Sequence, residues 1–493
     1  MDIAELNRRI KGERMKAGFY ETDITPLIGM EQPGGYGKMY VKGIHDRLKV
    51  RAAVINDGKE TVALVGVDTC VIQSAEPVKA IRTEIEKLTG IKGAGVLIGA
   101  SHTHAGGPLF GLREDEYEDA PDLVKKLVSR YSTVPDPLYY KYFVGQAVTA
   151  VCEAYGRMED VLISCGSGVE DRVAFNRRLK MKQGRTYTHP GKGNPDIIGP
   201  AGPIDPEVGV LAAWNKKGEL MGCVVNYACH GTTNYGAVTA DWIYHLEKRI
   251  QGAMNPGATV VFLNGASGDI TQVDNLSMSE REVGEKYSDF VGSRVGAEAV
   301  KVMVTAEKVD SFPLACRQEF LKMKRRKPSK ARVEKSLEIV EDGLEKSRFD
   351  TEWTFAKELL ITDYLVNKKP ESEVEVQGIQ VGPAVFLANP AEFFCQLGLD
   401  IKKASAFPLT FVVELANGSC GYVPGEKAFS PEGGGYETVL TSYSNLETGA
   451  GEKIVKASLD IAAVFKPDKV PQPPRVKEAA SPWNYGILGP DLD

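Results

Sequence analysis

The feature that most constrains the fold of this chain is the alternation of apolar, strand-like runs with segments of helical spacing. A hairpin turn signal, Asn56-Asp57-Gly58, separates the runs RLKVRAAVIN and ETVALVGVD. Residues 74–90 then have helical spacing, and residues 94–100 have the pattern of a buried strand. The same alternation resumes near Val208 and near Val374. This order predicts an α/β fold with a mixed β-sheet core and flanking helices, although no internal repeat is visible.

Two segments depart from this alternation. Residues from about 317 to 370 are rich in Lys and Glu, which predicts a helical insertion that covers the functional site. Residues 466–493 are rich in proline, which predicts an extended C-terminal arm and a place where a homo-oligomer would form. The rest of the sequence, with the insertion, is expected to be one domain spanning residues 1–465.

Composition excludes several classes of function. The net charge of −6 is small for 493 residues and gives no electrostatic reason to expect nucleic acid or an anionic membrane as partner. No window approaches the roughly 18–20 apolar residues of a membrane span, and residues 1–20 lack the apolar core of a signal peptide. Eight cysteines form no CxxC pair. We therefore expect a reduced, cytoplasmic protein that acts on a small-molecule substrate.

Polar side chains gather directly after the apolar runs. Because loops from the carboxyl ends of strands converge in α/β sheets, these side chains are expected to surround one pocket at that edge. Five clusters have this placement: His102 with His104, His230, Asn264 to Asp269, Glu392, and Tyr422.

The residue types in these clusters suit a metal ion. In a strand-like HxH sequence both side chains point to the same face. A distant histidine and a carboxylate would complete a three-ligand set with one open position, and catalytic zinc needs that position for water.

Each cluster also has a simpler interpretation. His230 alone is compatible with a core histidine bonded to backbone. Glu392 opens a helix predicted over residues 392–404, where the helix dipole favours a carboxylate in any case. The NGASGD segment reads equally as a tight turn or an anion-binding nest. Tyr422 and Tyr436 would be structural by default.

Taken together, the motifs resemble those of the neutral, non-lysosomal ceramidases, which are zinc amidohydrolases that cleave an N-acyl bond. The similarity keeps the same order from about residue 17 to 465 and implies that family's fold and chemistry. The segments that carry it are ETDITPLIGMEQPGGYG, SHTHAGGP, NYACHGTT, NGASGDIT, NPAEFF and GYVPGEKAFSPEGGGYE.

The resemblance also implies roles for single residues. His104 would lie beside the metal as proton shuttle and substrate contact. Arg177, in AFNRRL, and Tyr436, in GGYE, would steady the negative oxygen that forms when water attacks the carbonyl. The implied zinc ligands are His102, His230, Glu392 and Tyr422.

Three features depart from the family pattern. Thr271-Gln272-Val273 follows Asp269-Ile270 where ceramidases have Ser-Pro-Asn, which leaves the roles of Thr271 and Asp269 open. The spacing from Tyr422 to Tyr436 is two residues longer than in ceramidases. The characterised ceramidases are secreted or surface enzymes with an added C-terminal β-sandwich, and neither feature is expected here.

These observations favour a zinc-dependent hydrolase of an N-acyl compound more polar than ceramide. An esterase or lactonase using the same zinc is the closest alternative. A phosphoesterase, with NGASGD and Arg177 holding phosphate, would need more metal ligands than the sequence offers. A metal-stabilised binding protein would have no need for His104, Arg177 and Tyr436 beside its ligands.

Overall fold

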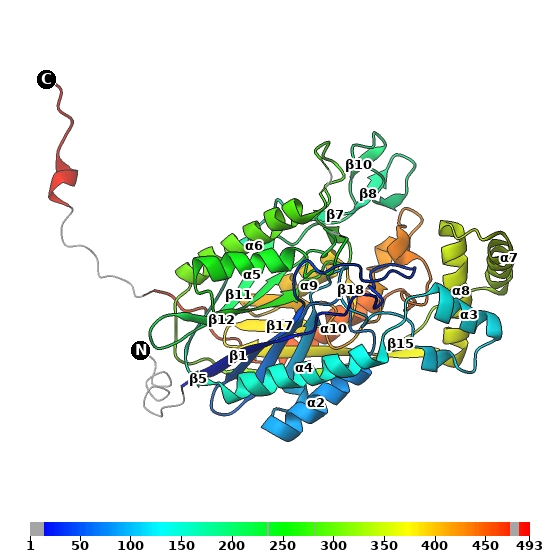
Figure 1. Cartoon of the computed structure of the whole chain (residues 1–493). Helices are drawn as coiled ribbons and strands as arrows, with labels where there is room; N and C mark the ends of the chain where they lie inside the picture. The colour runs from blue at the N-terminus through cyan, green and yellow to red at the C-terminus, as the bar shows by residue number, and fades with distance from the viewer. Residues whose placement is uncertain (1–13, 234–235, 281, 474–482) are drawn as a thin grey trace.

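Three β-sheets form the centre of the molecule, and helices cover their outer faces (Figure 1). The computed structural model describes residues 14–233, 236–280, 282–473 and 483–493. The expected α/β class with mixed sheets and flanking helices is confirmed. The first thirteen residues, whose polarity argued against a signal peptide, lie outside the described part.

The strands of each sheet are as follows. The first sheet, β4-β3-β2-β1-β5, contains β1 (Lys16–Asp23), β2 (Lys49–Asn56), β3 (Thr61–Val67), β4 (Val96–Ala100) and β5 (Glu159–Asp160). The second, β13-β12-β11-β6, contains β6 (Leu162–Val169), β11 (Glu207–Trp214), β12 (Leu220–Tyr227) and β13 (Thr259–Asn264). The third, β15-β16-β17-β19, contains β15 (Leu314–Lys324), β16 (Glu371–Val381), β17 (Ala384–Ala388) and β19 (Leu409–Val413).

Each sheet is built on the same succession of an antiparallel hairpin, a helix and a parallel strand. In the first sheet, β2 and β3 form the hairpin, α2 (Ala75–Thr89) follows, and β4 lies parallel to β3. The second sheet repeats this with β11, β12, α5 (Trp242–Ala253) and β13. The third repeats it with β16, β17, α9 (Cys395–Ala404) and β19. The chain therefore contains a structural repeat that its sequence does not reveal, because many different apolar residues can fill a buried strand.

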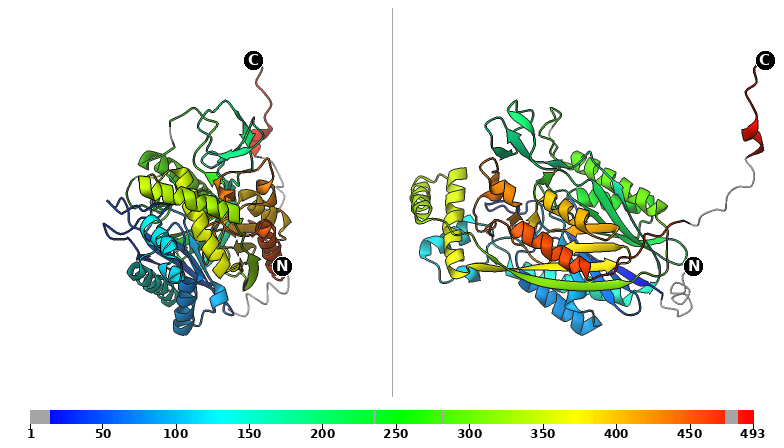
Figure 2. Two further views of the ribbon diagram at one scale, coloured as in Figure 1. Left: turned by 90° about the vertical axis from the view of Figure 1, so that its right-hand side faces the viewer. Right: turned by 180° about the vertical axis from the view of Figure 1, so that it is seen from behind.

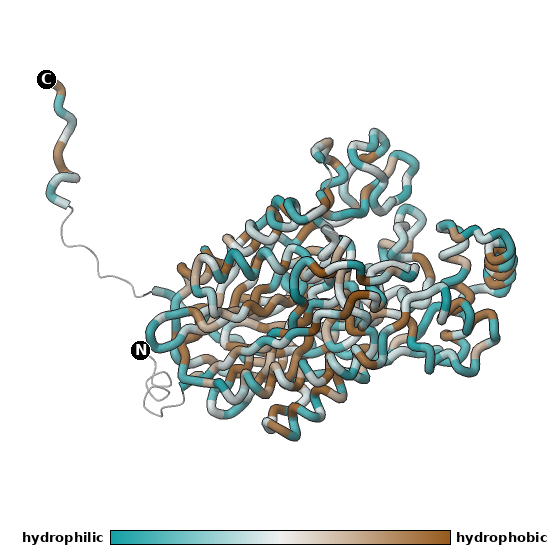
Figure 3. Tube along the Cα trace, viewed as in Figure 1, coloured by the Kyte–Doolittle hydropathy of each residue, from teal (hydrophilic) through white to brown (hydrophobic). Residues whose placement is uncertain are grey.

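The inner faces of the three sheets share one apolar core, which appears as brown segments along the central strands in Figure 3. A Cβ atom at Gly66 would lie 2.5 Å from the carbonyl oxygen of Phe262, so only glycine lets β3 come this close to β13. Every sheet contributes side chains to the core, among them Leu64, Leu97, Leu263, Phe386 and Phe411.

Pairs of helices cover the outer faces. The first sheet packs against α2 and α4 (Pro137–Gly156), and the second against α5 and α6 (Glu285–Thr305). The third sheet packs against α9 and α10 (Ala450–Ala463), and α10 lies across its strands in the view from behind (Figure 2). With both faces covered, the sheets hold the ends of their strands in fixed positions.

The predicted helical insertion begins later than expected. Residues 314–324 form β15, an edge strand in which Arg317, Lys322 and Lys324 are exposed, and that exposure explains the composition that suggested a helix. The helical part consists of α7 (Lys330–Lys346) and α8 (Thr351–Lys368). Both pack with α3 (Asp122–Tyr131) in an apolar cluster of their own.

The C-terminal arm is described in part. Residues 466–473 have no regular secondary structure, and Val470 packs against the central core. Residues 474–482 lie outside the described residues, and Asn484–Ile487 form a short 3-10 helix. Self-association through this arm stays a prediction. Within the described ranges, no helix combines the length and apolar character needed to span a membrane.

Candidate metal centre

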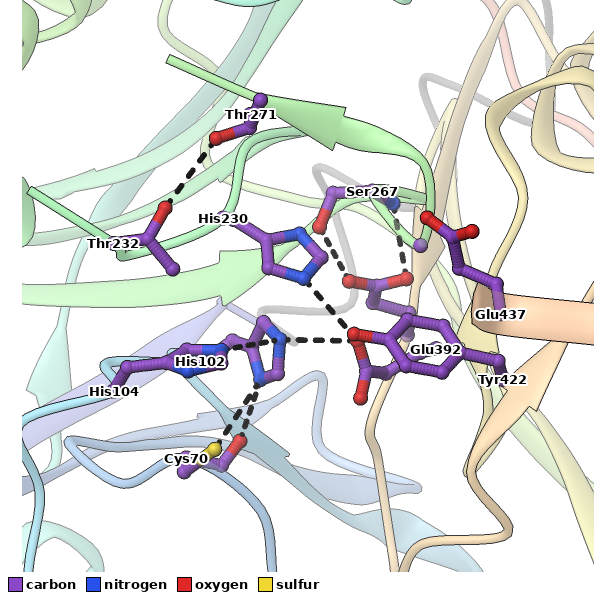
Figure 4. A network of polar contacts seen from close by, with 12 residues as sticks. Cys70, His102, His104, His230, Thr232, Ser267, Thr271, Glu392, Tyr422 and Glu437 are labelled. Carbon is purple, nitrogen blue, oxygen red and sulfur yellow. Dashed lines mark hydrogen bonds and ion pairs between the residues drawn. The ribbon is translucent and has the colours of Figure 1, made fainter. Parts of the chain in front are cut away.

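Three side chains from three different sheets meet at one point, and we call them the donor cluster: His102, His230 and Glu392 (Figure 4). His102 follows β4, His230 follows β12, and Glu392 follows β17. The Nε2 atoms of both histidines lie 3.2 Å from Oε2 of Glu392. All three side chains are buried. The structure thus brings together side chains that are separated by more than a hundred residues in the sequence.

Backbone geometry and a hydrogen bond hold His102 in place. Its φ of +64° lies in the left-handed region, which a residue other than glycine adopts rarely and usually where function requires it. Its Nδ1 donates to the carbonyl oxygen of Cys70 at 2.8 Å. Because a carbonyl oxygen only accepts, Nδ1 carries a proton, and Nε2 is the nitrogen that is directed at the other donors.

The donor cluster fits a metal ion. Oε2 of Glu392 is buried and finds no hydrogen-bond partner among the residues that the structure describes, which is costly for a carboxylate oxygen unless a cation satisfies it. Burial alone would raise the pKa of Glu392, but His102 and His230 hold it well below its ordinary value, so the group is a carboxylate. Ligands about 2.0–2.1 Å from a tetrahedral zinc ion are about 3.3 Å apart. The two 3.2 Å distances from Oε2 of Glu392 to the histidine Nε2 atoms match that ligand-to-ligand distance.

Glu392 is not a helix cap. It lies in the short strand β18 (Glu392–Phe393), parallel to β20 (Tyr422–Val423), and α9 begins only at Cys395. Its second oxygen, Oε1, accepts a hydrogen bond of 2.8 Å from the hydroxyl of Tyr443. The carboxylate is thus oriented by a tyrosine on one side and faces the two histidines on the other.

His104 lies beside the donor cluster. Its Nε2 is 3.3 Å from Nε2 of His102, and its Nδ1 donates to the carbonyl oxygen of Gly34 at 2.9 Å. Burial and the neighbouring His102 lower the pKa of His104 to about 4. His104 is therefore a neutral imidazole whose free lone pair is on Nε2, which suits a proton acceptor.

Arg177 reaches the cluster from the opposite side. Its Nη1 lies 3.0 Å from Nε2 of His230. Nε donates to Glu437 at 2.9 Å and Nη2 donates to the carbonyl oxygen of Gly268 at 2.8 Å. These bonds fix the guanidinium in a buried position, where a fixed positive charge acts strongly on a reacting group.

The two predicted site tyrosines form a pair next to Arg177. The hydroxyls of Tyr422 and Tyr436 are 3.0 Å apart, and the Arg177 guanidinium lies 5.4 Å and 5.3 Å from their ring centres. Burial raises the pKa of Tyr436 to about 12 and that of Tyr422 well above its ordinary value. Both hydroxyls are therefore protonated donors at neutral pH.

The NGASGD segment is part of the framework and not an open anion nest. Ser267 N donates to Glu414 Oε2 at 2.9 Å, and Asn264 donates to the other oxygen of the same carboxylate at 3.1 Å. Asp269 accepts from Asn176 and from the backbone of Cys395, both at 2.8 Å. The protein's own carboxylate therefore occupies the place that phosphate would need.

Three residues that sequence reasoning missed support the site. Glu437, which holds Arg177, could have been predicted from the sequence, because it directly follows Tyr436. Cys70, which holds His102, lies three residues after the end of β3, so the rule for strand ends could also have pointed to it. Tyr443 follows no strand, and nothing in the sequence points to it.

A cavity of about 230 Å³ opens beside His104 and Glu392. Glu358 of α8 lines it, so the helical insertion does border the site as expected. Lys357 beside it anchors the helix by donating to the carbonyl oxygens of Tyr36 and Tyr131 at 3.1 Å and 3.0 Å. The cavity walls include Tyr36, Phe110, Leu112, Ser132, Thr133 and Tyr443.

Known proteins share this sequence pattern and fold, although no family model matches the chain. A neutral ceramidase from Pseudomonas aeruginosa is 24% identical over an alignment 444 residues long, which covers 78% of this chain and 62% of that protein. The chain thus spans less than two thirds of its relative's length. A ceramidase complexed with C2 matches with a TM-score of 0.68 at 18% identity, covering 93% of this chain and 77% of the other. A crystal structure of neutral ceramidase from Pseudomonas aeruginosa matches with a TM-score of 0.65 at 19% identity, covering 93% and 76%.

Proposed function

The sequence relationship and the shared fold support membership of the neutral ceramidase family, and from that premise we propose that this protein is a zinc-dependent hydrolase that cleaves the amide bond of an N-acyl compound. The observation that carries the proposal is the donor cluster, with its unsatisfied carboxylate oxygen, next to a neutral histidine. A structural metal site has no need for that histidine.

Two imidazole nitrogens and a carboxylate suit zinc among the common divalent ions. His102, His230 and Glu392 would hold the ion, with Tyr422 as the fourth ligand that the family resemblance implies. A bound zinc ion polarises a carbonyl group and lowers the pKa of water to about 7.

The chain's own residues would then move protons and steady charge. Nε2 of His104 accepts the proton of the attacking water and returns it to the departing amine nitrogen. Arg177 and the hydroxyl of Tyr436 donate to the carbonyl oxygen as negative charge develops on it. Glu437 keeps Arg177 in place for this role, because it binds Nε and leaves Nη1 directed at the site.

The size of the cavity supports a small or polar substrate. At about 230 Å³ it is smaller than the roughly 300–1,000 Å³ typical of sites for drug-sized ligands. Ser132, Thr133 and Glu358 add polar groups to its wall. A short N-acyl compound meets these limits better than a long-chain membrane lipid does. An ester or lactone of the same size is the second candidate, because the same residues would serve its hydrolysis.

Metal content and turnover, measured on the same preparations, test the proposal. The candidate substrates are N-acyl amides, esters and lactones. The wild-type protein is compared with the variant His104→Ala. We expect about one zinc ion per chain in both proteins and turnover of one substrate class, reduced by about 10²–10⁴-fold in the variant. Loss of zinc together with turnover would make His104 a ligand. Zinc without any turnover in the wild type would favour a binding protein.

We also propose a cytoplasmic location. All eight cysteines are free in the structure, which suits a reducing compartment. The experiment is fractionation of the native host, with detection by an antibody to the chain. Recovery of the chain in the medium or in a membrane fraction would contradict the proposal.

A further inference from the structure

A second cavity, of about 330 Å³, adjoins the catalytic one. Unlike the mainly apolar catalytic cavity, it is lined by several charged side chains and by polar backbone. A molecule bound at the donor cluster could extend past the shared wall into this space. Five residues line both cavities: Gln73, Gly111, Leu112, Ser442 and Tyr443.

Arg325 is a cation of this second cavity without an acidic partner. Its Nη1 donates to Asn445. Nε is buried without a partner, and within the described residues no carboxylate lies within ion-pair distance of the guanidinium. Burial lowers the pKa of Arg325, although an arginine remains charged at pH 7. A half-buried positive charge with spare donors favours a bound anion.

The neighbouring Arg326 shows what a structural arginine looks like in the same segment. All three of its nitrogens donate to backbone carbonyl oxygens, those of Thr438, Ser444 and Leu446, at 2.9 to 3.0 Å. The guanidinium of Arg325 makes one hydrogen bond, and its acceptor is the side-chain oxygen of Asn445. A purely structural role therefore explains Arg326, because it uses all of its nitrogens. The same role does not explain Arg325, which keeps donors without an acceptor among the described residues.

Most other charged groups of the cavity have a partner. Glu375 is paired with Arg82 at 2.9 Å, and Glu371 is exposed to solvent at the start of β16. Glu116 acts on Arg325 through space but is itself paired with Lys369, so no acidic group of the described wall forms an ion pair with Arg325. The remaining pairs are Arg113 with Glu76, Lys79 with Glu373, and Lys369 with Glu116.

We propose that the second cavity binds a carboxylate carried by the substrate, and that Arg325 recognises it. This inference rests on the proposed amide hydrolysis and names its substrate class: an N-acyl compound with a free carboxylate at some distance from the scissile bond. The planar guanidinium matches a carboxylate better than a compact ammonium would. Gln73 has a buried side-chain oxygen without a partner at the junction of the cavities, where it would accept a hydrogen bond from the connecting part of the substrate.

Paired substrates test the proposal kinetically. Each pair consists of N-acyl amides of equal length whose acyl chain ends either in a carboxylate or in its methyl ester. We expect the wild type to prefer the carboxylate by about 10–100-fold in kcat/KM, as for other charge-assisted hydrogen bonds. Arg325→Met should remove this preference through KM and leave the ester unchanged, and Arg325→Lys should restore part of it. Arg113→Met is the matched control, because Arg113 lines the same cavity but has acidic partners.

A direct binding measurement separates this inference from the proposed activity. Glutarate and, in a second titration, inorganic phosphate are titrated by calorimetry into the wild type and Arg325→Met. Binding of glutarate that the substitution abolishes supports the carboxylate site even if no amide is hydrolysed. Tighter binding of phosphate than of glutarate, equal binding to both proteins, or no binding to either would overturn it, as would an equal effect of Arg325→Met on both members of each substrate pair.

Discussion

Two buried polar clusters lie close to the strand ends of the first two sheets, and they differ in how their charges are matched. Arg51 on β2 contacts Asp68 at 2.7 Å and Glu247 on α5 at 2.6 Å, so the cation has two carboxylates. In the donor cluster, Oε2 of Glu392 has two imidazoles beside it and no hydrogen bond. Both clusters are nearly inaccessible to solvent.

This difference separates a structural cluster from a binding site. Removing charges from water is costly, and a fold can carry that cost where opposite charges meet within it. The Arg51 cluster meets that condition within the chain. The donor cluster brings three ligand atoms to one point and leaves Oε2 of Glu392 without a hydrogen bond among the described residues, which is why we propose that a metal ion completes it. Breaking each cluster should therefore give opposite results in stability and in metal content.

The largest effect is expected from His230→Ala. Without this nitrogen the cluster has two donors, and we expect zinc content to fall from about one ion per chain to near zero, with turnover reduced by at least about 10³-fold. Elemental analysis and rate measurements on the same samples check this. His245→Ala, on the side of α5 that faces α6 and away from the donor cluster, is the control and should keep its zinc. A variant that loses turnover but retains zinc would remove His230 from the ligand set.

Arg51→Met should leave the zinc content unchanged and lower the stability. The substitution leaves buried Asp68 without its cation and Glu247 with Lys49 alone, which costs about 3–5 kcal/mol of unfolding free energy. Urea unfolding of the zinc-loaded proteins measures it. Arg157→Met, which breaks the exposed pair with Glu153, is the control and should cost less than about 1 kcal/mol. Equal costs for the two variants would contradict the distinction between the clusters.

The same cluster predicts a pH dependence of stability. Burial alone would raise the pKa of Glu247, but Arg51 and Lys49 lower it to about 2. Because the folded-state pKa lies below the unfolded one, the stabilisation is present above about pH 4.5 and is lost as the pH falls toward 2, by about 3 kcal/mol in full. The difference in unfolding free energy between wild type and Glu247→Gln, followed from pH 7 to 2, should shrink over that window. A difference that stays constant would refute the lowered pKa.

The sequence predicts the donor cluster well because of where its members lie. An apolar run marks a buried strand, and the residue that follows it must lie at the strand's carboxyl end, so His102 and His230 are placed by pattern alone. The same rule locates Glu392 after β17, but the sequence assigns it to the following helix, because the six residues between β17 and α9 carry no signal of a strand as short as β18.

Residues placed by tertiary contacts could not be predicted in this way. Arg325 directly follows β15, the strand misread as helix, because half-exposed edge strands carry the charges of a helix surface. Tyr443 comes from an irregular segment between β20 and α10, whose path is set by packing and not by local periodicity. Its contact with Glu392 is therefore visible only in three dimensions.

Removing the hydrogen bond between Tyr443 and Glu392 should have the smallest effect of these substitutions. It is also the most precise test of how the donor cluster differs from the Arg51 cluster. Tyr443→Phe keeps the ring and removes the single hydrogen bond to Oε1 of Glu392. Hydrogen bonds that orient a metal ligand typically contribute about 10–100-fold in affinity, so the dissociation constant for zinc should rise by that factor while the fold and the apolar contact with Phe110 are kept. Competition with a chelator of known affinity measures it. Tyr142→Phe, whose hydroxyl bonds the backbone of Asp23 far from the site, is the control. If Tyr443→Phe bound zinc as tightly as that control, Glu392 would be oriented by the metal alone.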